Sequence, residues 1–318
     1  MTDAPPASGR QVELRHGRHT ATVVEVGGGI RSYTVAGVDV LDGYPPDEMC
    51  VGAKGQTLIP WPNRVEDGAY EFDGQSFQLP LTEAEKHNAI HGLVRWQSWH
   101  VDDAAGSASG AGETGHVALT CRLHPSPGYP YTVDLRNEYT LDDDGLTVRT
   151  VATNVGSRRC PYAVGFHPYL TVGTPRIDEA VLTIPGGTRL PTDDRGIPTG
   201  REDVGATGYD FRSPRRIGDI EIDTTYVDLE RDAHGRAEVT LAAPDGSRSV
   251  TLWLDEAFPY VEIFTGDTLP PDQRRTGLGV EPMTCAPNAF RTGDGLLVLE
   301  PGEQVTTTWG IRTTGYPG

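Results

Sequence analysis

The sequence is poor in cysteine, has few long apolar runs, and carries less positive than negative charge. Its 318 residues include four cysteines, and no two lie at the short spacing of a zinc knuckle or a redox dithiol. We therefore expect reduced thiols and a cytoplasmic protein. No run of 18 apolar residues occurs, and the N-terminal segment lacks an apolar stretch of signal-peptide length. Neither a membrane span nor an export signal is expected.

Positive charge is the next shortage. Lysine and arginine number 27 against 45 aspartates and glutamates, which gives a formal net charge of −18. Like charges repel, so we expect neither nucleic acid nor an anionic membrane surface as a partner. Apolar residues still make up 36% of the chain, which is typical of a folded globular protein rather than a disordered polyelectrolyte.

Glycine and proline are plentiful, with 39 and 25 residues, and they punctuate segments in which apolar residues occupy every second position. This pattern predicts short strands joined by tight turns. Asp73-Gly74 should close one hairpin, because this dipeptide accepts the positive φ of a type I′ turn. Residues 142–145 and 244–246 should close two more. A strand over residues 296–299 is apolar on both faces, which suits the centre of a thick sandwich.

We therefore predict an all-β fold, a large antiparallel β-sandwich forming one domain over residues 1–318, with residues 1–10 flexible. The one helical candidate is residues 82–88. Two stretches rich in glycine and polar residues, 104–115 and 191–213, are expected to be surface insertions.

Two histidines stand where regular strand structure should break. His91 precedes Gly92, and His167 precedes Pro168, so each imidazole should lie at a strand end or bend. Such positions often hold functional side chains, although a buried histidine bonded to backbone would fit the same pattern.

Two charged residues also have unusual neighbours. Glu281 lies among small and apolar residues, where desolvation would raise its pKa above about 4.3 and make it a better base. A surface glutamate at a turn is the alternative. Arg64 follows an apolar, proline-stiffened segment, and it could bind a ligand or form an ion pair with a neighbouring strand.

Taken in order, several segments resemble the aldose 1-epimerases, or galactose mutarotases, in a form similar to the bacterial branch of that superfamily. The segments are GGGIRSYTVAGVDVLDGY, PWPNRVEDGAYEFDGQSFQLP, NAIHGLVRWQSW, YAVGFHPYL, FPYVEIFTG and GVEPMTCAPNAF. Each motif is short, but their order and spacing across most of the chain make the combination specific.

This resemblance implies a β-supersandwich, the galactose mutarotase-like fold, and interconversion of the α and β anomers of a free aldose. It implies that Glu281 is the base at the C1 hydroxyl and His167 the acid at the ring oxygen, on opposite sides of C1. His91 would hydrogen-bond the sugar, and Arg64 would orient it. No metal and no cofactor are implied. We expect a small-molecule monosaccharide as partner and a monomer or homodimer.

The family also implies an aspartate that binds a sugar hydroxyl. Asp223 matches best, while Asp219 and Asp228 lie close by in the sequence. Aromatic side chains often pack against sugar C–H faces, and they also fill cores. The candidates are Trp61, Trp96 and Phe264.

Several alternatives stay open. An epimerase of a phosphorylated or otherwise anionic hexose would need extra cations, for which Arg64 and Arg95 are the candidates. A glycoside hydrolase would need a second carboxyl group beside Glu281, which no motif supplies. Two further alternatives are a sugar-binding sandwich without catalytic activity and a metal site formed by His91, His167 and Glu281.

Overall fold

The structure is a computed structural model that describes residues 5–102 and 115–317. In this part of the chain all long elements are strands, and every strand pairing is antiparallel. This confirms the predicted all-β sandwich. Among the described residues, no helix has the length and apolar character needed to cross a bilayer.

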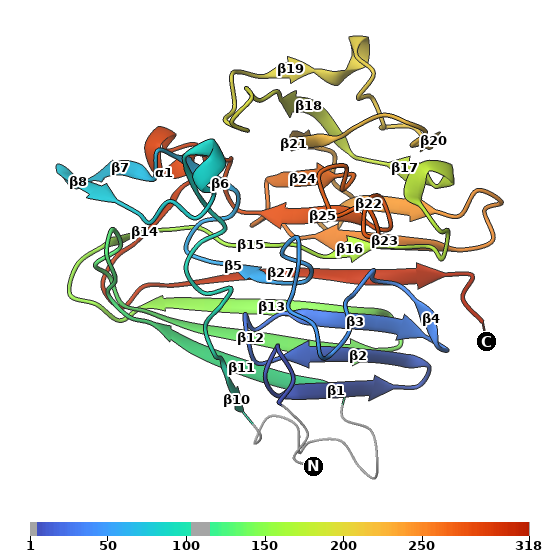
Figure 1. Ribbon diagram of the computed structural model, residues 1–318, viewed down its shortest axis with the longest axis horizontal. Helices are drawn as coiled ribbons and strands as arrows, with labels where there is room; N and C mark the ends of the chain where they lie inside the picture. The colour runs from blue at the N-terminus through green and yellow to red at the C-terminus, as the bar shows by residue number, and fades with distance from the viewer. Residues whose placement is uncertain (1–4, 103–114, 318) are drawn as a thin grey trace.

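The largest sheet has nine strands and forms one layer of the molecule (Figure 1). In spatial order they are β10 (His100–Asp102), β11 (His116–Leu123), β12 (Val133–Asp142), β13 (Gly145–Asn154), β27 (Gln304–Thr314), β23 (Ser249–Leu254), β22 (Ala237–Ala242), β17 (Val181–Thr183) and β20 (Arg215–Arg216).

Two sheets face this layer. The eight-stranded sheet contains β19 (Glu202–Asp203), β18 (Gly186–Leu190), β21 (Asp223–Leu229), β24 (Tyr260–Phe264), β25 (Leu278–Met283), β15 (Gly165–Phe166) and β5 (Thr57–Leu58), with β16 (Tyr169–Leu170) paired to β25. The four-stranded sheet contains β1 (Gln11–His16), β2 (His19–Val24), β3 (Ile30–Val35) and β4 (Val38–Asp39), and its β1 and β2 lie against β12.

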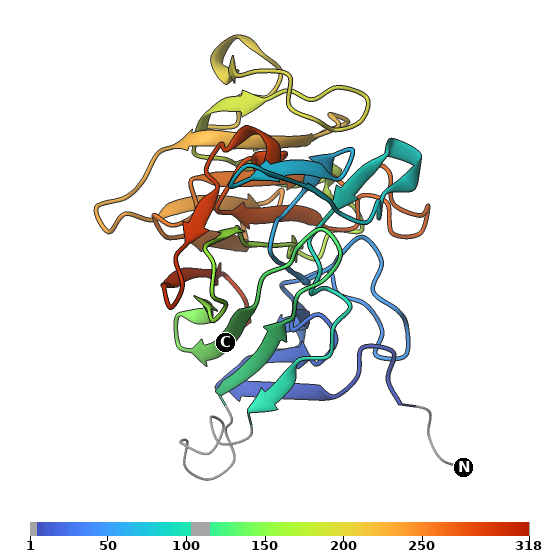
Figure 2. The same ribbon diagram turned by 90° about the vertical axis from the view of Figure 1, so that its left-hand side faces the viewer.

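Several short elements lie at one end of the sandwich. They are the pairs β6 (Arg64–Glu66) with β9 (Asn88–Ile90), β7 (Ala69–Phe72) with β8 (Gln75–Gln78), and β14 (Cys160–Tyr162) with β26 (Leu297–Leu299). Within residues 5–102 and 115–317, the helical elements are α1 (Ala289–Thr292) and the 3₁₀ turns η1 (Ala84–Lys86), η3 (Ile177–Glu179) and η4 (Val204–Ala206). Figure 2 looks at this end of the molecule, where β7, β8 and α1 lie toward the viewer.

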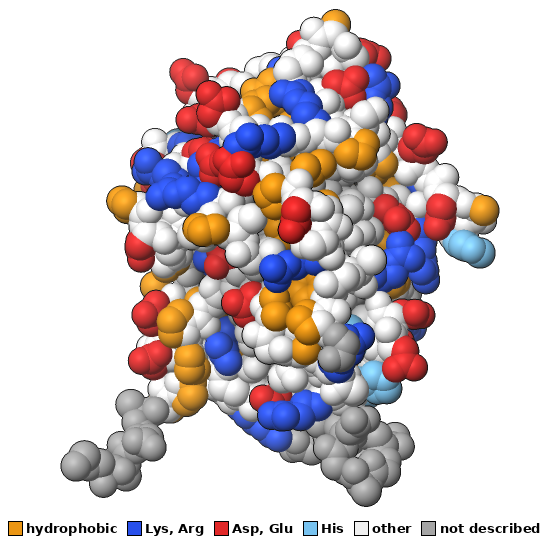
Figure 3. Space-filling model, turned by 90° about the vertical axis from the view of Figure 1, so that its right-hand side faces the viewer, with side chains coloured by type: hydrophobic (Ala, Val, Ile, Leu, Met, Phe, Trp, Pro, Cys, Tyr) orange, Lys and Arg blue, Asp and Glu red, His pale blue; other side chains and the backbone are white. Residues whose placement is uncertain are grey.

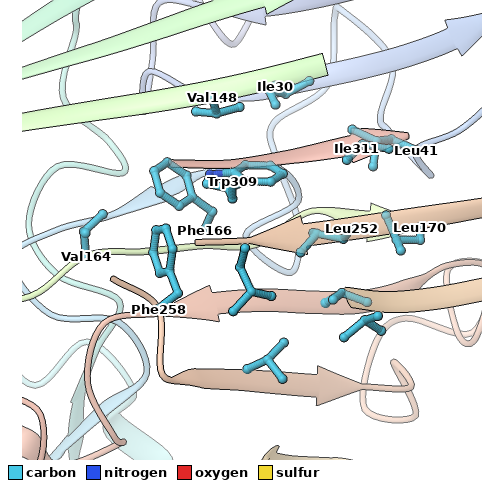
Figure 4. Close-up of a cluster of buried hydrophobic side chains, with 14 of the residues drawn as sticks. Ile30, Leu41, Val148, Val164, Phe166, Leu170, Leu252, Phe258, Trp309 and Ile311 are labelled. Carbon is cyan, nitrogen blue, oxygen red and sulfur yellow. The ribbon is translucent and has the colours of Figure 1, made fainter. Parts of the chain in front are cut away.

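The core lies between the two layers, where alternate strand residues point inward. Phe166 of β15 packs against Trp309 of β27, with ring centroids 5.2 Å apart, and Phe258 packs on the other side of Phe166 (Figure 4). One hydrophobic cluster includes residues of all three large sheets. The opposite face of the eight-stranded sheet is therefore left for polar side chains.

The predicted hairpins are confirmed. Asp73 and Gly74 both have positive φ, 51° and 72°, between β7 and β8, as a type I′ turn requires. Residues 142–145 join β12 to β13, and residues 244–246 lie between β22 and β23.

Other expectations need correction. Residues 297–299 form β26, which pairs only with β14, and Val298 is 39% exposed, so this is not a central strand. Within residues 82–88 a single 3₁₀ turn forms, followed at Asn88 by β9. The stretch 191–213 buries Phe211 and Val204 and is more than a surface loop. Except for Gly115, the expected insertion 104–115 lies outside the described residues, as do residues 1–4.

The surface agrees with the composition. On the face shown in Figure 3, acidic and basic side chains are intermixed rather than gathered into a basic patch. That face offers no obvious site for a polyanion.

Candidate functional site

One cavity, with a volume of about 360 Å³, brings together all five residues singled out from the sequence: Arg64, His91, His167, Asp223 and Glu281 all line it. It lies within the size range of small-molecule sites, about 300–1,000 Å³.

The floor of the cavity follows from the two-residue period of the strands. In β25, Leu278 and Val280 enter the core, so Glu281 points to the opposite face. In β24, Val261 and Ile263 enter the core in the same way, and Glu262 lies directly opposite Glu281 in the register. Strand alternation alone thus turns two carboxyl groups out of the core, and of these Glu281 lines the cavity.

His167 reaches the same place by the same rule. Phe166 points into the core, and the next side chain along the chain points into the cavity. The Nε2 atom of His167 lies 3.1 Å from Oε1 of Glu281, and both side chains are buried. The ring stacks on Tyr169 at a centroid distance of 5.0 Å, which fixes its plane. Imidazole and carboxyl are therefore in direct contact.

Burial governs the protonation of this pair. Burial and the neighbouring carboxyls of Glu262 and Asp223 raise the pKa of Glu281 well above its usual range, in the direction predicted from the sequence. Burial lowers the pKa of His167 to about 3. Without a ligand, the uncharged forms of both groups are therefore favoured. One proton lies between them, bonded to Glu281 and donated in a hydrogen bond to Nε2 of His167.

This contact does not fit the expectation that the two groups lie on opposite sides of a sugar carbon. A carbon atom between them would need about 7 Å, two van der Waals contacts of about 3.5 Å each. At 3.1 Å the pair can instead present two neighbouring atoms to one edge of a sugar. The second oxygen of Glu281, Oε2, is buried and has no hydrogen-bond partner among the described residues.

Glu262 is the residue that the sequence analysis missed. It is buried, its Oε2 accepts a hydrogen bond from the hydroxyl of Thr225, and burial together with Asp223 raises its pKa well above the usual range. The signal was present in the alternation of FPYVEIFTG, where the glutamate falls on the face opposite to the core residues. A second carboxyl group beside Glu281 does therefore exist, contrary to our expectation.

His91 is set by a backbone bend. Its φ is 62°, and the following Gly92 has a φ of 69°, where a Cβ atom would lie 2.1 Å from the carbonyl oxygen of Ile59. The N–H of Asn63 donates to Nδ1 of His91 at 3.2 Å, so the ring proton lies on Nε2. Burial lowers the pKa of His91 well below its usual value, so the ring is a neutral N–H donor.

The ion pair considered for Arg64 is present, with Glu83 as its partner, and ligand binding by Arg64 stays a prediction. Its guanidinium lines the cavity and donates from Nε to Oε2 of Glu83 at 2.9 Å and from Nη2 to Oε1 at 3.0 Å. This fork fixes the direction of the side chain. Gly196 lies so close that a Cβ atom there would be 2.6 Å from Nη1 of Arg64. The stretch 191–213 thus packs directly behind the arginine.

The three aromatic candidates lie in three different environments. Phe264 lines the cavity, opposite Asp223 in the strand register. Trp61 is buried and packs against Phe290, so it belongs to the core. Trp96 is 48% exposed.

A metal centre is not supported. Within residues 5–102 and 115–317, no group of three or more histidine, cysteine, aspartate or glutamate side chains is arranged to hold a metal ion.

Sequence comparison finds a matching family and a similar protein. The family model described as aldose 1-epimerase matches residues 10–312. The uncharacterized protein YihR of Escherichia coli (strain K12) is 35% identical over 297 residues, which are 93% of this chain and 91% of YihR.

More distant proteins extend the comparison. The galactose mutarotase of Homo sapiens is 28% identical over 205 residues, 63% of this chain and 56% of that protein. The crystal structure of a GalM/aldose epimerase homologue from C. elegans superposes with a TM-score of 0.83 at 18% identity, covering 96% of this chain and 98% of that one. The sequence match and the shared fold show that this chain belongs to the aldose 1-epimerase family.

Proposed function

We propose that this protein is a mutarotase, an isomerase that interconverts the α and β anomers of a monosaccharide by opening and reclosing its ring. The observation that carries the proposal is the buried contact between Glu281 and His167, two residues that both line the cavity. Acid and base are adjacent, so one sugar edge can meet both.

Ring opening moves one proton off the sugar and one onto it. A carboxylate at Glu281 takes the proton of the C1 hydroxyl while Nε2–H of His167 protonates the ring oxygen, and the C1–O5 bond breaks to give an aldehyde. Rotation about C1–C2 and the reverse transfers restore both groups. The pair holds one proton before and after, so the catalyst returns unchanged.

The sugar itself must shift the shared proton from Glu281 to His167. A C1 hydroxyl donating to Glu281 favours the carboxylate, and a ring oxygen accepting from His167 favours the imidazolium. The neutral N–H of His91 and the fixed guanidinium of Arg64 supply further donors to sugar oxygens, and Asp223 supplies an acceptor. Because the neutral pair and the ion pair differ only by one proton transfer across the contact of 3.1 Å, little reorganisation is needed.

Substitution of the pair tests the proposal. Glu281→Gln and His167→Asn should each lower catalysed anomer exchange by about 10²–10⁴-fold, measured by saturation-transfer NMR. The control Glu71→Gln, an exposed residue of β7, should exchange like the wild type. Wild-type rates in both site variants would refute the roles. His91→Asn should slow exchange, and Arg64→Ala should mainly raise KM.

The second carboxyl group makes one rival worth a direct measurement. Glu262 and Glu281 are direct cross-strand neighbours on the adjacent strands β24 and β25. A glycoside hydrolase uses a pair of carboxyl groups. Release of nitrophenol from nitrophenyl glycosides, lost in Glu281→Gln, would favour hydrolysis over anomer exchange. We expect none.

A cytoplasmic location is part of the proposal. All four cysteines are free thiols, which is usual in a reducing compartment.

A further inference from the structure

Three cationic side chains line the cavity, and they differ in their partners. Arg64 is bonded to Glu83, and Nζ of Lys86 lies 4.0 Å from the same carboxylate. The guanidinium of Arg95 has no ion pair and no hydrogen bond with any residue in the described parts of the chain. One positive charge in the site is therefore uncommitted.

Arg95 is held in place from behind. Its carbonyl oxygen accepts a hydrogen bond from Nε2 of Gln56 at 2.8 Å, and its guanidinium lies 5.4 Å from the ring centroid of Trp96. The side chain is half-buried, and burial lowers the pKa of Arg95. A guanidinium that has lost water without gaining an anion is unfavourable in a protein used only for its fold. A bound oxyanion would supply the missing partner.

Arg95 also lies near the reacting groups. Its charge lowers the pKa of both His91 and His167, and all three residues line the same cavity. One small molecule can therefore meet the Glu281–His167 pair at one end and Arg95 at another.

We propose that the sugar turned over at this site carries a singly charged oxyanion, such as a sulfonate, a sulfate ester or a carboxylate, at a carbon away from C1, and that Arg95 binds it. The inference rests on the proposed mutarotase function and narrows its substrate class.

The charge balance of the cavity limits the anion to one negative charge. Glu83 and Glu85 also line it, and the chain carries a net charge of −18. A phosphate, with up to two negative charges at neutral pH, would leave one charge facing these carboxylates. A single guanidinium matches a single charge, and its planar fork can donate two parallel hydrogen bonds to one oxyanion.

The test compares sugars that differ in charge. Anomer exchange is measured by saturation-transfer NMR with glucose, glucuronate, glucose 6-sulfate and glucose 6-phosphate, for the wild type, Arg95→Gln, Arg95→Lys and the control Arg159→Gln. Arg159 pairs with Asp73 on the surface. The wild type should favour the two monoanionic sugars in kcat/KM. Arg95→Gln should lose about 10- to 100-fold on these two, the worth of a charged hydrogen bond, and change little on glucose.

Several results would overturn the inference. An equal loss on glucose and glucuronate in Arg95→Gln would show that Arg95 acts on the histidines or on folding instead. A preference of the wild type for glucose, or for the phosphate, would exclude a monoanion site. Loss of the charge preference in Lys86→Gln and not in Arg95→Gln would assign the anion to Lys86.

A binding measurement separates this inference from the proposed function. If the wild type exchanges no sugar, the mutarotase function fails. Calorimetric titration with glucuronate then decides the anion site, which stands if Arg95→Gln weakens binding and falls if it does not. If glucose is exchanged and the monoanions are not, the function stands and the inference falls.

Discussion

At the scale of single residues, burial determines how the site holds its protons. Glu281 and His167 are in contact where water is excluded, so the uncharged forms of both are favoured. Nδ1 of His167, like Oε2 of Glu281, is buried without a partner among the described residues. The pair therefore behaves as one titrating unit with one proton, and its apparent pKa values belong to the pair.

This coupling predicts an unusual pH profile. The one-proton form gains a second proton only when His167 is protonated, near pH 3, and loses its proton at the raised pKa of Glu281. Anomer exchange should therefore stay level as the pH falls through about 6.5, the ordinary pKa of histidine, and decline on the alkaline side. The measurement is kcat/KM against pH with glucose and with a monoanionic sugar. An acid limb near 6.5 would mean that His167 titrates alone.

Glu262 predicts a pH-dependent stability. Its pKa is raised in the folded state, so the folded chain keeps a proton that the unfolded chain has lost above about 4.3. The stabilisation is complete below that pH and is lost as the pH rises through the folded-state pKa. Glu262→Gln cannot titrate, and its amide oxygen can still accept from Thr225. It should unfold at a higher temperature than the wild type at neutral pH.

The control for this prediction is Glu71→Gln, because Glu71 is exposed. Thermal unfolding of the three proteins is followed from acid to neutral pH. The gap between Glu262→Gln and the wild type should widen as the pH rises. A gap that is constant with pH would show that the effect comes from packing and not from the proton.

At the scale of elements, the cavity wall depends on a segment that resembles an ordinary loop in the sequence. Arg195 donates to the carbonyls of Lys86 and His87, both at 2.9 Å, and its own carbonyl accepts from Asn88. Asn88 in turn donates to Glu83, which holds Arg64. The stretch 191–213 therefore braces the segment 83–88 and, through it, the arginine of the site.

Removing this brace should weaken substrate binding. Arg195→Ala frees the carbonyls of residues 86 and 87, so Glu83 and Arg64 should lose their fixed orientation. We expect KM to rise about fivefold, equivalent to about 1 kcal/mol, with kcat changed less. Arg212→Ala is the matched control, since Arg212 pairs only locally with Asp210. A fall in kcat with KM unchanged would contradict a positioning role.

At the scale of the whole molecule, the packing between the two layers and the position of the site depend on neighbouring residues of one segment. Phe166 fills the space between β15 and β27, and His167 is the next residue in the chain. The same peptide thus joins the core to the imidazole that lines the cavity. His167 is also held by backbone bonds, with its carbonyl accepting from Gly55 at 2.9 Å.

A large-to-small substitution tests this link. Phe166→Ala should lower the free energy of unfolding by about 3–5 kcal/mol, because it leaves a cavity between the layers. Denaturant unfolding measures this. Val298→Ala, at a position 39% exposed, should stay within about 0.5 kcal/mol of the wild type. If Phe166→Ala is no less stable than Val298→Ala, the contact with Trp309 is not a central part of the core.

The sequence by itself determined the local structure of this protein, because alternation and turn chemistry act over a few residues. The hairpin at Asp73-Gly74, the bend at His91 and the polar face of β25 could all be predicted. The family motifs also named the five residues of the site.

Tertiary structure decided how these pieces meet. The pairing of β24 with β25 places Glu262 opposite Glu281, and the pairing of β15 with β25 brings His167 into contact with the same glutamate. The ion pair of Arg64 and the unpartnered state of Arg95 likewise depend on segments far away in the chain. The proton shared by Glu281 and His167 and the unpaired charge of Arg95 depend on which groups share a buried space, and strand pairings between distant segments decide that.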